Sequence, residues 1–143
     1  MQPASSLPAY VQVVLDTPDV RGLAEFYRQL LGYVYRPGDE PRADERDVDW
    51  LVVRHPSGSP RIAFQYTETL HRSTWPQPDV PQQLHLDLSV PSKADLDAQH
   101  QRVLDLGASL RFDRSEDPQE PLRVYTDPAG HPFCIFVAPP ASP

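Results

Sequence analysis

The chain is poor in cysteine and in basic residues, and it lacks a long apolar run. Cys134 is the only cysteine, which excludes an intrachain disulfide and a zinc site built on several cysteines. No apolar run reaches the roughly eighteen residues of a membrane span, and the first ten residues lack the pattern of a secretory signal. Thirteen basic and twenty acidic residues give a net charge of −7, which disfavours nucleic-acid binding. These absences predict a cytoplasmic protein whose partners include neither membranes nor nucleic acids.

Proline, by contrast, is abundant. The chain has 18 prolines, and most of them lie in turns or near the ends, where they interrupt regular structure. A length of 143 residues suits a single domain with one sizeable core. We therefore expect one domain over residues 1–143, with a disordered tail at 139–143.

Hydrophobic periodicity predicts the same order of elements twice, a strand, a helix and three strands. In the first half the strands are expected at 10–16, 33–35, 49–54 and 61–66, and the helix at 18–31. In the second half the strands are expected at 84–90, 108–113, 122–126 and 132–137, and the helix at 92–106. Thr17 and Ser92 are the predicted caps, and Gly32 and Gly107 the predicted ends, of the two helices. The predicted fold class is thus α+β, with two tandem βαβββ modules at about 8–67 and 82–138 joined by a connection at 68–81.

The two halves also match residue by residue at several positions. Gln12 aligns with His85, HPSG at 55–58 with DPAG at 127–130, and FQY at 64–66 with FCI at 133–135. Such self-similarity indicates an internal repeat. The alternative is an unrelated α+β domain with two helices on one face of a mixed sheet.

Three segments resemble the vicinal oxygen chelate superfamily, and in particular its glyoxalase-like and bleomycin-resistance-like proteins. They are QVVLDTPDVRGLAEFYRQLLGY, TWPQPDVPQQLHLDLSV and VYTDPAGHPFCIFV. The resemblance implies that the paired modules curl into an open, barrel-like mixed sheet around a cavity for a small molecule. It also implies a homodimer.

In this superfamily the metal ligands come from the first and last strands of each module. The resemblance places those positions at Gln12, Gln65, His85 and Cys134. The usual set is His or Gln, Glu, His and Glu, so Gln65 and Cys134 replace both carboxylates. Without them a hard divalent ion would bind weakly, and we expect no cofactor and a degenerate or absent metal site. A weak divalent metal at these four residues is the alternative, and zinc could be held by a Cys134 thiolate together with His85.

The strand around His85 alternates strictly between polar and apolar residues. His85, Asp87 and Ser89 share one face, and the opposite face carries Leu84, Leu86 and Leu88, which we expect in the core. The polar face either is exposed to solvent or lines a pocket. We expect the pocket, because the superfamily geometry turns this face inward. Gln12, Gln65, His85 and Asp87 are therefore predicted to share one cavity.

Aromatic and sulfur-containing side chains complete the predicted site. Trp50 and Trp75 are expected at the rim of the cavity, where aromatic walls suit planar or apolar ligands. Cys134 lies between two apolar residues and is expected to behave as a small hydrophobic residue rather than as a nucleophile. The other histidines are predicted to be solvated, and they are His55, His71, His100 and His131.

Two functions follow from these observations. The first is a glyoxalase-like protein that binds a small organic molecule in the sheet cavity, with no catalytic residue assigned. Its predicted ligand-binding residues are Gln12, Trp50, Gln65, His85, Asp87 and Cys134. Drug-sequestering proteins of the superfamily bind cationic antibiotics, and the net charge of −7 is compatible with such a ligand. The alternative is a divalent-metal-dependent lyase, isomerase or dioxygenase that uses His85.

Overall fold

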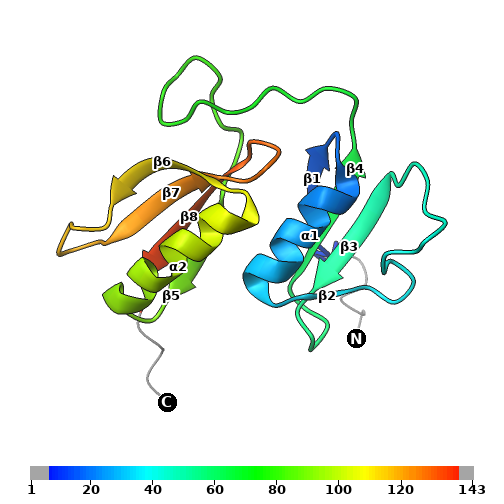
Figure 1. Ribbon diagram of the computed structural model, residues 1–143, viewed down its shortest axis with the longest axis horizontal. Helices are drawn as coiled ribbons and strands as arrows, with labels where there is room; N and C mark the ends of the chain where they lie inside the picture. The colour runs from blue at the N-terminus through cyan, green and yellow to red at the C-terminus, as the bar shows by residue number, and fades with distance from the viewer. Residues whose placement is uncertain (1–6, 139–143) are drawn as a thin grey trace.

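The computed structural model describes residues 7–138 and contains two sheets, each with one helix (Figure 1). The first module comprises β1 (Val13–Thr17), α1 (Val20–Leu31), β2 (Val34–Tyr35), β3 (Trp50–Arg54) and β4 (Arg61–Tyr66). The second comprises β5 (Leu86–Val90), α2 (Lys93–Leu106), β6 (Ser109–Arg114), β7 (Leu122–Thr126) and β8 (Pro132–Val137). None of the helices within residues 7–138 has the length and apolar character needed to cross a membrane. The predicted tail at 139–143 lies outside the described residues.

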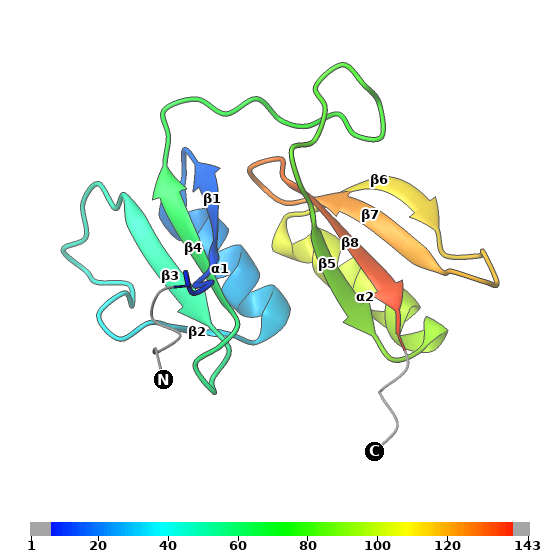
Figure 2. The same ribbon diagram turned by 180° about the vertical axis from the view of Figure 1, so that it is seen from behind.

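The two sheets have the same strand order. One runs β1-β4-β3-β2 and the other β5-β8-β7-β6, and in each the first strand pairs in parallel with the last while the remaining pairs are antiparallel. Figure 2 shows the two sheets side by side from the side away from the helices. This repetition confirms the two βαβββ modules and the open mixed-sheet architecture, and it contradicts a single mixed sheet with two helices. Within the described residues the sheets do not close into a barrel.

The first helix begins later than predicted, because Asp19 caps it and not Thr17. The Asp19 carboxylate accepts a hydrogen bond from the Gly22 backbone N–H at 2.9 Å. Thr17 is instead the last residue of β1, and its hydroxyl accepts from the Asp19 N–H at 3.0 Å. Gly32 ends the helix as predicted, with a φ of 70° that glycine adopts without strain.

The second helix begins and ends as predicted. Ser92 Oγ accepts from the Asp95 backbone N–H at 3.1 Å and donates to the Asp95 carboxylate at 2.7 Å. Gly107, with a φ of 122°, follows the last turn. Local sequence therefore determines this helix, because its cap and its end lie within the segment itself.

Strands β1 and β5 both begin a few residues later than predicted. Pairing starts at Val13 with Ile62 and at Leu86 with Phe133, so Gln12 and His85 directly precede their strands. Leu84 has no strand beside it and is 51% exposed, which contradicts its predicted place in the core. Leu86 and Leu88 do pack against the core, as expected.

The modules share one hydrophobic core. Tyr27 of α1 stacks on Phe64 of its own module with ring centroids 5.9 Å apart, and it meets the edge of Phe133 of β8 at 6.3 Å. Phe133 also contacts Phe26 at 6.0 Å and Tyr125 at 5.4 Å, and it is fully buried. Aromatic pairs at these distances add to the free energy of burial. Aromatic side chains of both modules thus form part of the contact between them.

A buried polar group lies beside this core. Asp127, at the start of the β7–β8 turn, is fully buried, and its Oδ1 accepts from the backbone N–H groups of Ala129, Gly130 and His131 at 2.9 to 3.0 Å. Tyr27 donates its hydroxyl to Asp127 Oδ2 at 2.7 Å, across the two modules. Burial, with the neighbouring carboxylate, raises the pKa of Tyr27 well above its usual value.

Two histidines interpreted as solvated instead have protein partners. His131 Nδ1 lies 2.9 Å from Asp127 Oδ2, and its side chain is only 18% exposed. His100 Nδ1 lies 2.8 Å from the Tyr125 hydroxyl. Both histidines therefore belong to the hydrogen-bonded surroundings of the shared core, and the prediction of solvation was wrong for them.

Acidification is expected to weaken the fold through Glu25 on α1. Hydrogen bonds from Arg28 lower the pKa of Glu25 from 4.5 to about 2, with further bonds from Tyr35 and Gln29. A carboxyl whose pKa is lower in the folded chain than in the unfolded chain stabilises the fold at pH values above the unfolded pKa. This stability is lost as the pH falls from about 4.5 to about 2. The thermal midpoint of Glu25→Gln should therefore depend less on pH in this window than that of the wild type. Glu68→Gln, an exposed control, should follow the wild type.

Candidate functional site

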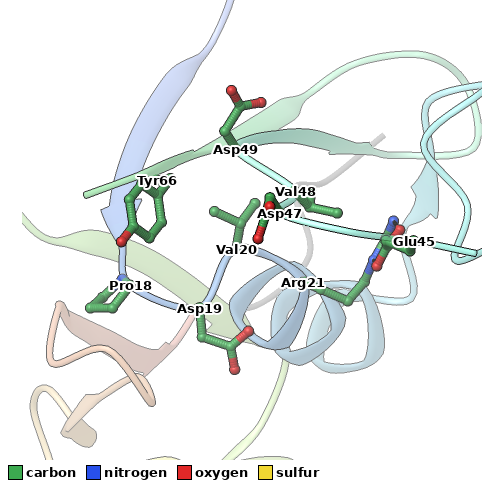
Figure 3. A pocket seen from close by; sticks show the side chains of 9 residues that line it. All are labelled: Pro18, Asp19, Val20, Arg21, Glu45, Asp47, Val48, Asp49 and Tyr66. Atoms are coloured by element: carbon green, nitrogen blue, oxygen red, sulfur yellow. Dashed lines mark hydrogen bonds and ion pairs between the residues drawn. The ribbon is translucent and has the colours of Figure 1, made fainter. Parts of the chain in front are cut away.

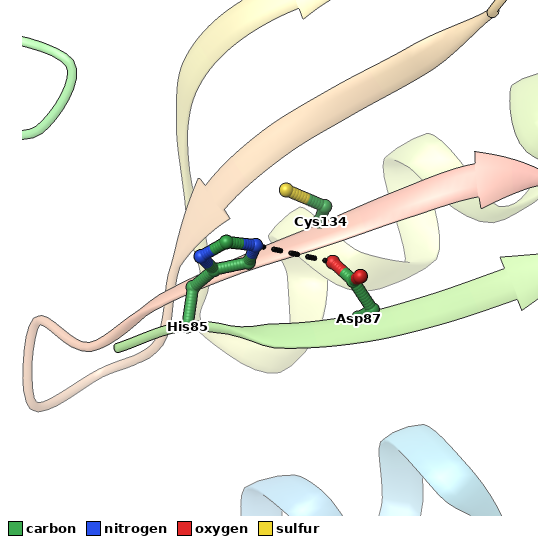
Figure 4. A group of neighbouring side chains, drawn as sticks. All are labelled: His85, Asp87 and Cys134. Atoms are coloured by element: carbon green, nitrogen blue, oxygen red, sulfur yellow. Dashed lines mark ion pairs between the residues drawn. The ribbon is translucent and has the colours of Figure 1, made fainter.

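His85, Asp87 and Cys134 form a cluster on the second sheet (Figure 4). Asp87 of β5 pairs in register with Cys134 of β8, and His85 lies two residues before Asp87. One potential ligand atom from each residue lies within 4.8 Å of the others. His85 Nε2 is 3.2 Å from Asp87 Oδ1. Three of the sequence-predicted residues are thus brought together.

The cluster lies on the face of the sheet that is turned away from α2. Phe133 and Ile135, the neighbours of Cys134 in β8, belong to the core under the helices, so strand alternation places Cys134 on the opposite face. The side chains of His85 and Asp87 are 35% and 62% exposed, whereas Cys134 is buried. An imidazole and a carboxylate are therefore accessible to a ligand above a buried thiol.

The connection between the modules supplies two more side chains. The indole of Trp75 lies parallel to the His85 ring, with centroids 5.7 Å apart and planes inclined by 8°. The side-chain amide of Gln82 reaches His85 Nδ1 at 2.9 Å. Sequence reasoning expected Trp75 only at the rim and missed Gln82, since the path of this proline-punctuated segment has no periodic signal.

The donor set does not fit a hard divalent ion. Burial raises the pKa of the Cys134 thiol, and the nearby Asp87 carboxylate adds to this effect, so the sulfur is protonated at neutral pH. One carboxylate and one imidazole then remain, and manganese or magnesium prefers several oxygen ligands. Zinc suits nitrogen and sulfur ligands, but it would first have to displace the thiol proton. The raised pKa also argues against Cys134 as a nucleophile.

The predicted residues of the first module lie on the other sheet. Trp50 of β3 pairs in register with Gln65 of β4, so the two side chains are neighbours on one face. Gln12 precedes β1, and its Oε1 is buried without a hydrogen-bond partner among the described residues. The structure thus gives two groups on two sheets, and their shared cavity stays a prediction.

Two cavities lie near these groups. One of about 230 Å³ lies between the modules and is lined by Val14 and Asp16 of β1, by Gln82 and Leu84 beside the cluster, and by His131. Another, of about 590 Å³, opens at the start of α1 (Figure 3). The larger cavity is lined by Pro18, Asp19, Val20, Arg21, Glu45, Asp47, Val48, Asp49 and Tyr66. None of the sequence-predicted residues contributes to it, whereas the smaller cavity adjoins His85 through Gln82 and Leu84.

Solved structures with the same fold support the architecture. A glyoxalase/bleomycin resistance protein/dioxygenase family enzyme from Burkholderia phytofirmans is 17% identical, with a TM-score of 0.66 over 90% of this chain and 98% of its own. A variant of the fosfomycin resistance protein from Listeria monocytogenes, solved with Mn(II) and 1S,2S-dihydroxypropylphosphonic acid, is 13% identical, with a TM-score of 0.65 over 92% and 93%. No curated protein sequence matches this one. The model of the glyoxalase-like domain matches residues 12–136, and the chain therefore belongs to this family of the vicinal oxygen chelate superfamily.

Proposed function

We propose that the chain binds a small organic molecule on the open face of the second sheet, at His85, Asp87 and Cys134. The observation that carries the proposal is the exposed His85–Asp87 pair above a buried thiol, with the indole of Trp75 stacked against the imidazole. Polar groups that converge beside aromatic and apolar walls are typical of small-molecule sites. The accessible carboxylate and the net charge of −7 favour a ligand with a cationic or hydrogen-bond-donating group.

The cavity between the modules extends this site toward the first sheet. Leu84 and Val14 give it apolar walls, and Gln82 contacts both the cavity and His85. Gln12, Gln65 and Trp50 would complete the ligand contacts from the first module. In this proposal the chain binds its ligand as a homodimer and without a resident metal.

The proposal is tested by pairing a binding measurement with a stability measurement. His85→Ala should weaken binding of a hit from a screen of cationic and neutral small molecules by about 1–3 kcal/mol, because a buried ligand group loses its hydrogen-bond partner. The thermal midpoint should change far less, since His85 is outside the core. His55→Ala, at an exposed turn, is the control and should bind like the wild type. Normal binding by a destabilised His85→Ala would refute the assignment.

The alternative function is a divalent-metal-dependent lyase, isomerase or dioxygenase, which would require the buried thiol to lose its proton. A nitrogen, an oxygen and a sulfur ligand within 4.8 Å of one another are the observation for it. If wild-type protein bound zinc or manganese stoichiometrically in calorimetry, and His85→Ala did not, this second function would replace the first. In that case His85, Asp87 and Cys134 would hold the ion, which would supply a Lewis acid.

A further inference from the structure

The side-chain amide of Gln82 has one orientation that satisfies all of its neighbours. With its nitrogen toward His85, Gln82 donates to His85 Nδ1 at 2.9 Å and to the Leu84 carbonyl at 3.3 Å, and its oxygen accepts from Trp75 Nε1 at 3.0 Å. The opposite orientation sets the amide N–H groups against the indole N–H and the amide oxygen against the Leu84 carbonyl. An indole N–H only donates and a carbonyl only accepts, so these two groups determine which way the amide faces.

The amide orientation decides the tautomer of His85. Because Gln82 donates to Nδ1, this nitrogen must be the acceptor, and the ring proton is then on Nε2. Nε2 lies 3.2 Å from Asp87 Oδ1, where a proton on Nε2 can be donated to the carboxylate. The hydrogen-bond partners of both ring nitrogens therefore favour the same tautomer.

We infer that Gln82 is a positioning residue that, oriented by Trp75, holds His85 with its proton on Nε2 and so makes the site a hydrogen-bonding site rather than a metal site. This inference rests on the proposed function and identifies Gln82 as the residue that sets the tautomer of His85. A metal ion facing Asp87 and Cys134 needs the lone pair of Nε2, which is occupied by the proton in this tautomer. Moving that proton to Nδ1 requires the Gln82 amide to turn and to oppose the indole N–H. The segment between β4 and β5 thereby selects against metal through the side chains of Trp75 and Gln82.

The test reads the tautomer directly, without any ligand. Nitrogen NMR of wild-type protein in mildly alkaline buffer should show His85 protonated on Nε2 and not on Nδ1. In Gln82→Glu the carboxylate accepts a proton at Nδ1 but cannot donate one, so Nδ1 should become protonated. Zinc should then bind about 10- to 100-fold more tightly than to the wild type. Gln83→Glu adds the same charge one residue away, at an exposed position, and should leave both the tautomer and the zinc affinity close to those of the wild type.

Two results would overturn the inference. Wild-type His85 protonated on Nδ1 would show that the amide has the other orientation, and an unchanged tautomer in Gln82→Glu would show that Asp87 alone sets it. Trp75→Phe provides a second check, because it keeps an aromatic ring beside His85 but removes the indole N–H. That variant should show a mixture of the two tautomers. These readings are independent of organic ligand binding, so a failed ligand screen and a wrong role for Gln82 are distinguishable.

Discussion

Asp127→Ala is expected to lower the free energy of unfolding by about 3–5 kcal/mol, because the substitution leaves several buried groups without partners. Three backbone N–H groups of the β7–β8 turn donate to Asp127 Oδ1, and the Tyr27 hydroxyl donates to Oδ2. Asp127 is fully buried, so water does not readily replace the lost acceptor. Chemical denaturation of both proteins at the same pH measures the difference.

Two further variants separate the contribution of the turn to the free energy of unfolding from that of the contact between the modules. Asp127→Asn keeps an acceptor oxygen for the turn and should cost less than alanine. Tyr27→Phe removes only the hydrogen bond between the modules and should lower the free energy of unfolding by about 1 kcal/mol. If Tyr27→Phe were as damaging as Asp127→Ala, the main role of Asp127 would be to join the modules rather than to hold its own turn.

Phe133→Ala is expected to destabilise the chain by about 3–5 kcal/mol, the range for a large aromatic side chain removed from a packed core. Phe133 is fully buried and contacts Phe26 and Tyr27 of the first module as well as Tyr125 of its own. Its loss opens a cavity between the modules. Calorimetry should show a lower midpoint for a single transition that still involves the whole chain.

Phe112→Ala is the matched control, because it removes the same side chain from a position that is 45% exposed on β6. It should cost much less than Phe133→Ala. Two separate transitions in Phe133→Ala would also be informative, since they would show that this one ring couples the unfolding of the two modules. A change as small as that of Phe112→Ala would contradict the shared core.

The order of elements could be predicted from sequence because it depends on local patterns. Helix α2 is the clearest case, since Ser92, Asp95 and Gly107 act within a few residues of the backbone groups that they satisfy. The starts of β1 and β5 could not be predicted as well. A strand begins where pairing with its partner begins, and the partners of Val13 and Leu86 are Ile62 and Phe133, far along the chain.

The candidate site was predictable only in part, for the same reason. Strand alternation placed His85 and Asp87 on one face, and the resemblance gave Cys134 as a ligand position. The three residues do lie together. Gln82 and the stacking of Trp75 depend on how the connection folds back over β5, which leaves no periodic signal in its sequence. The partners of His131 and His100 were missed too, because both contacts come from tertiary packing.

The parallel pairing of first and last strands also affects the chain while it is being synthesised. β1 emerges early but has no sheet partner until β4 has been made, and β5 waits in the same way for β8. Tyr27 lacks its partners for longer still, since Asp127 and Phe133 come about a hundred residues later. A nascent first module therefore carries an uncovered aromatic face until nearly the whole described chain has left the ribosome, and during this interval it is most exposed to aggregation and to chaperones.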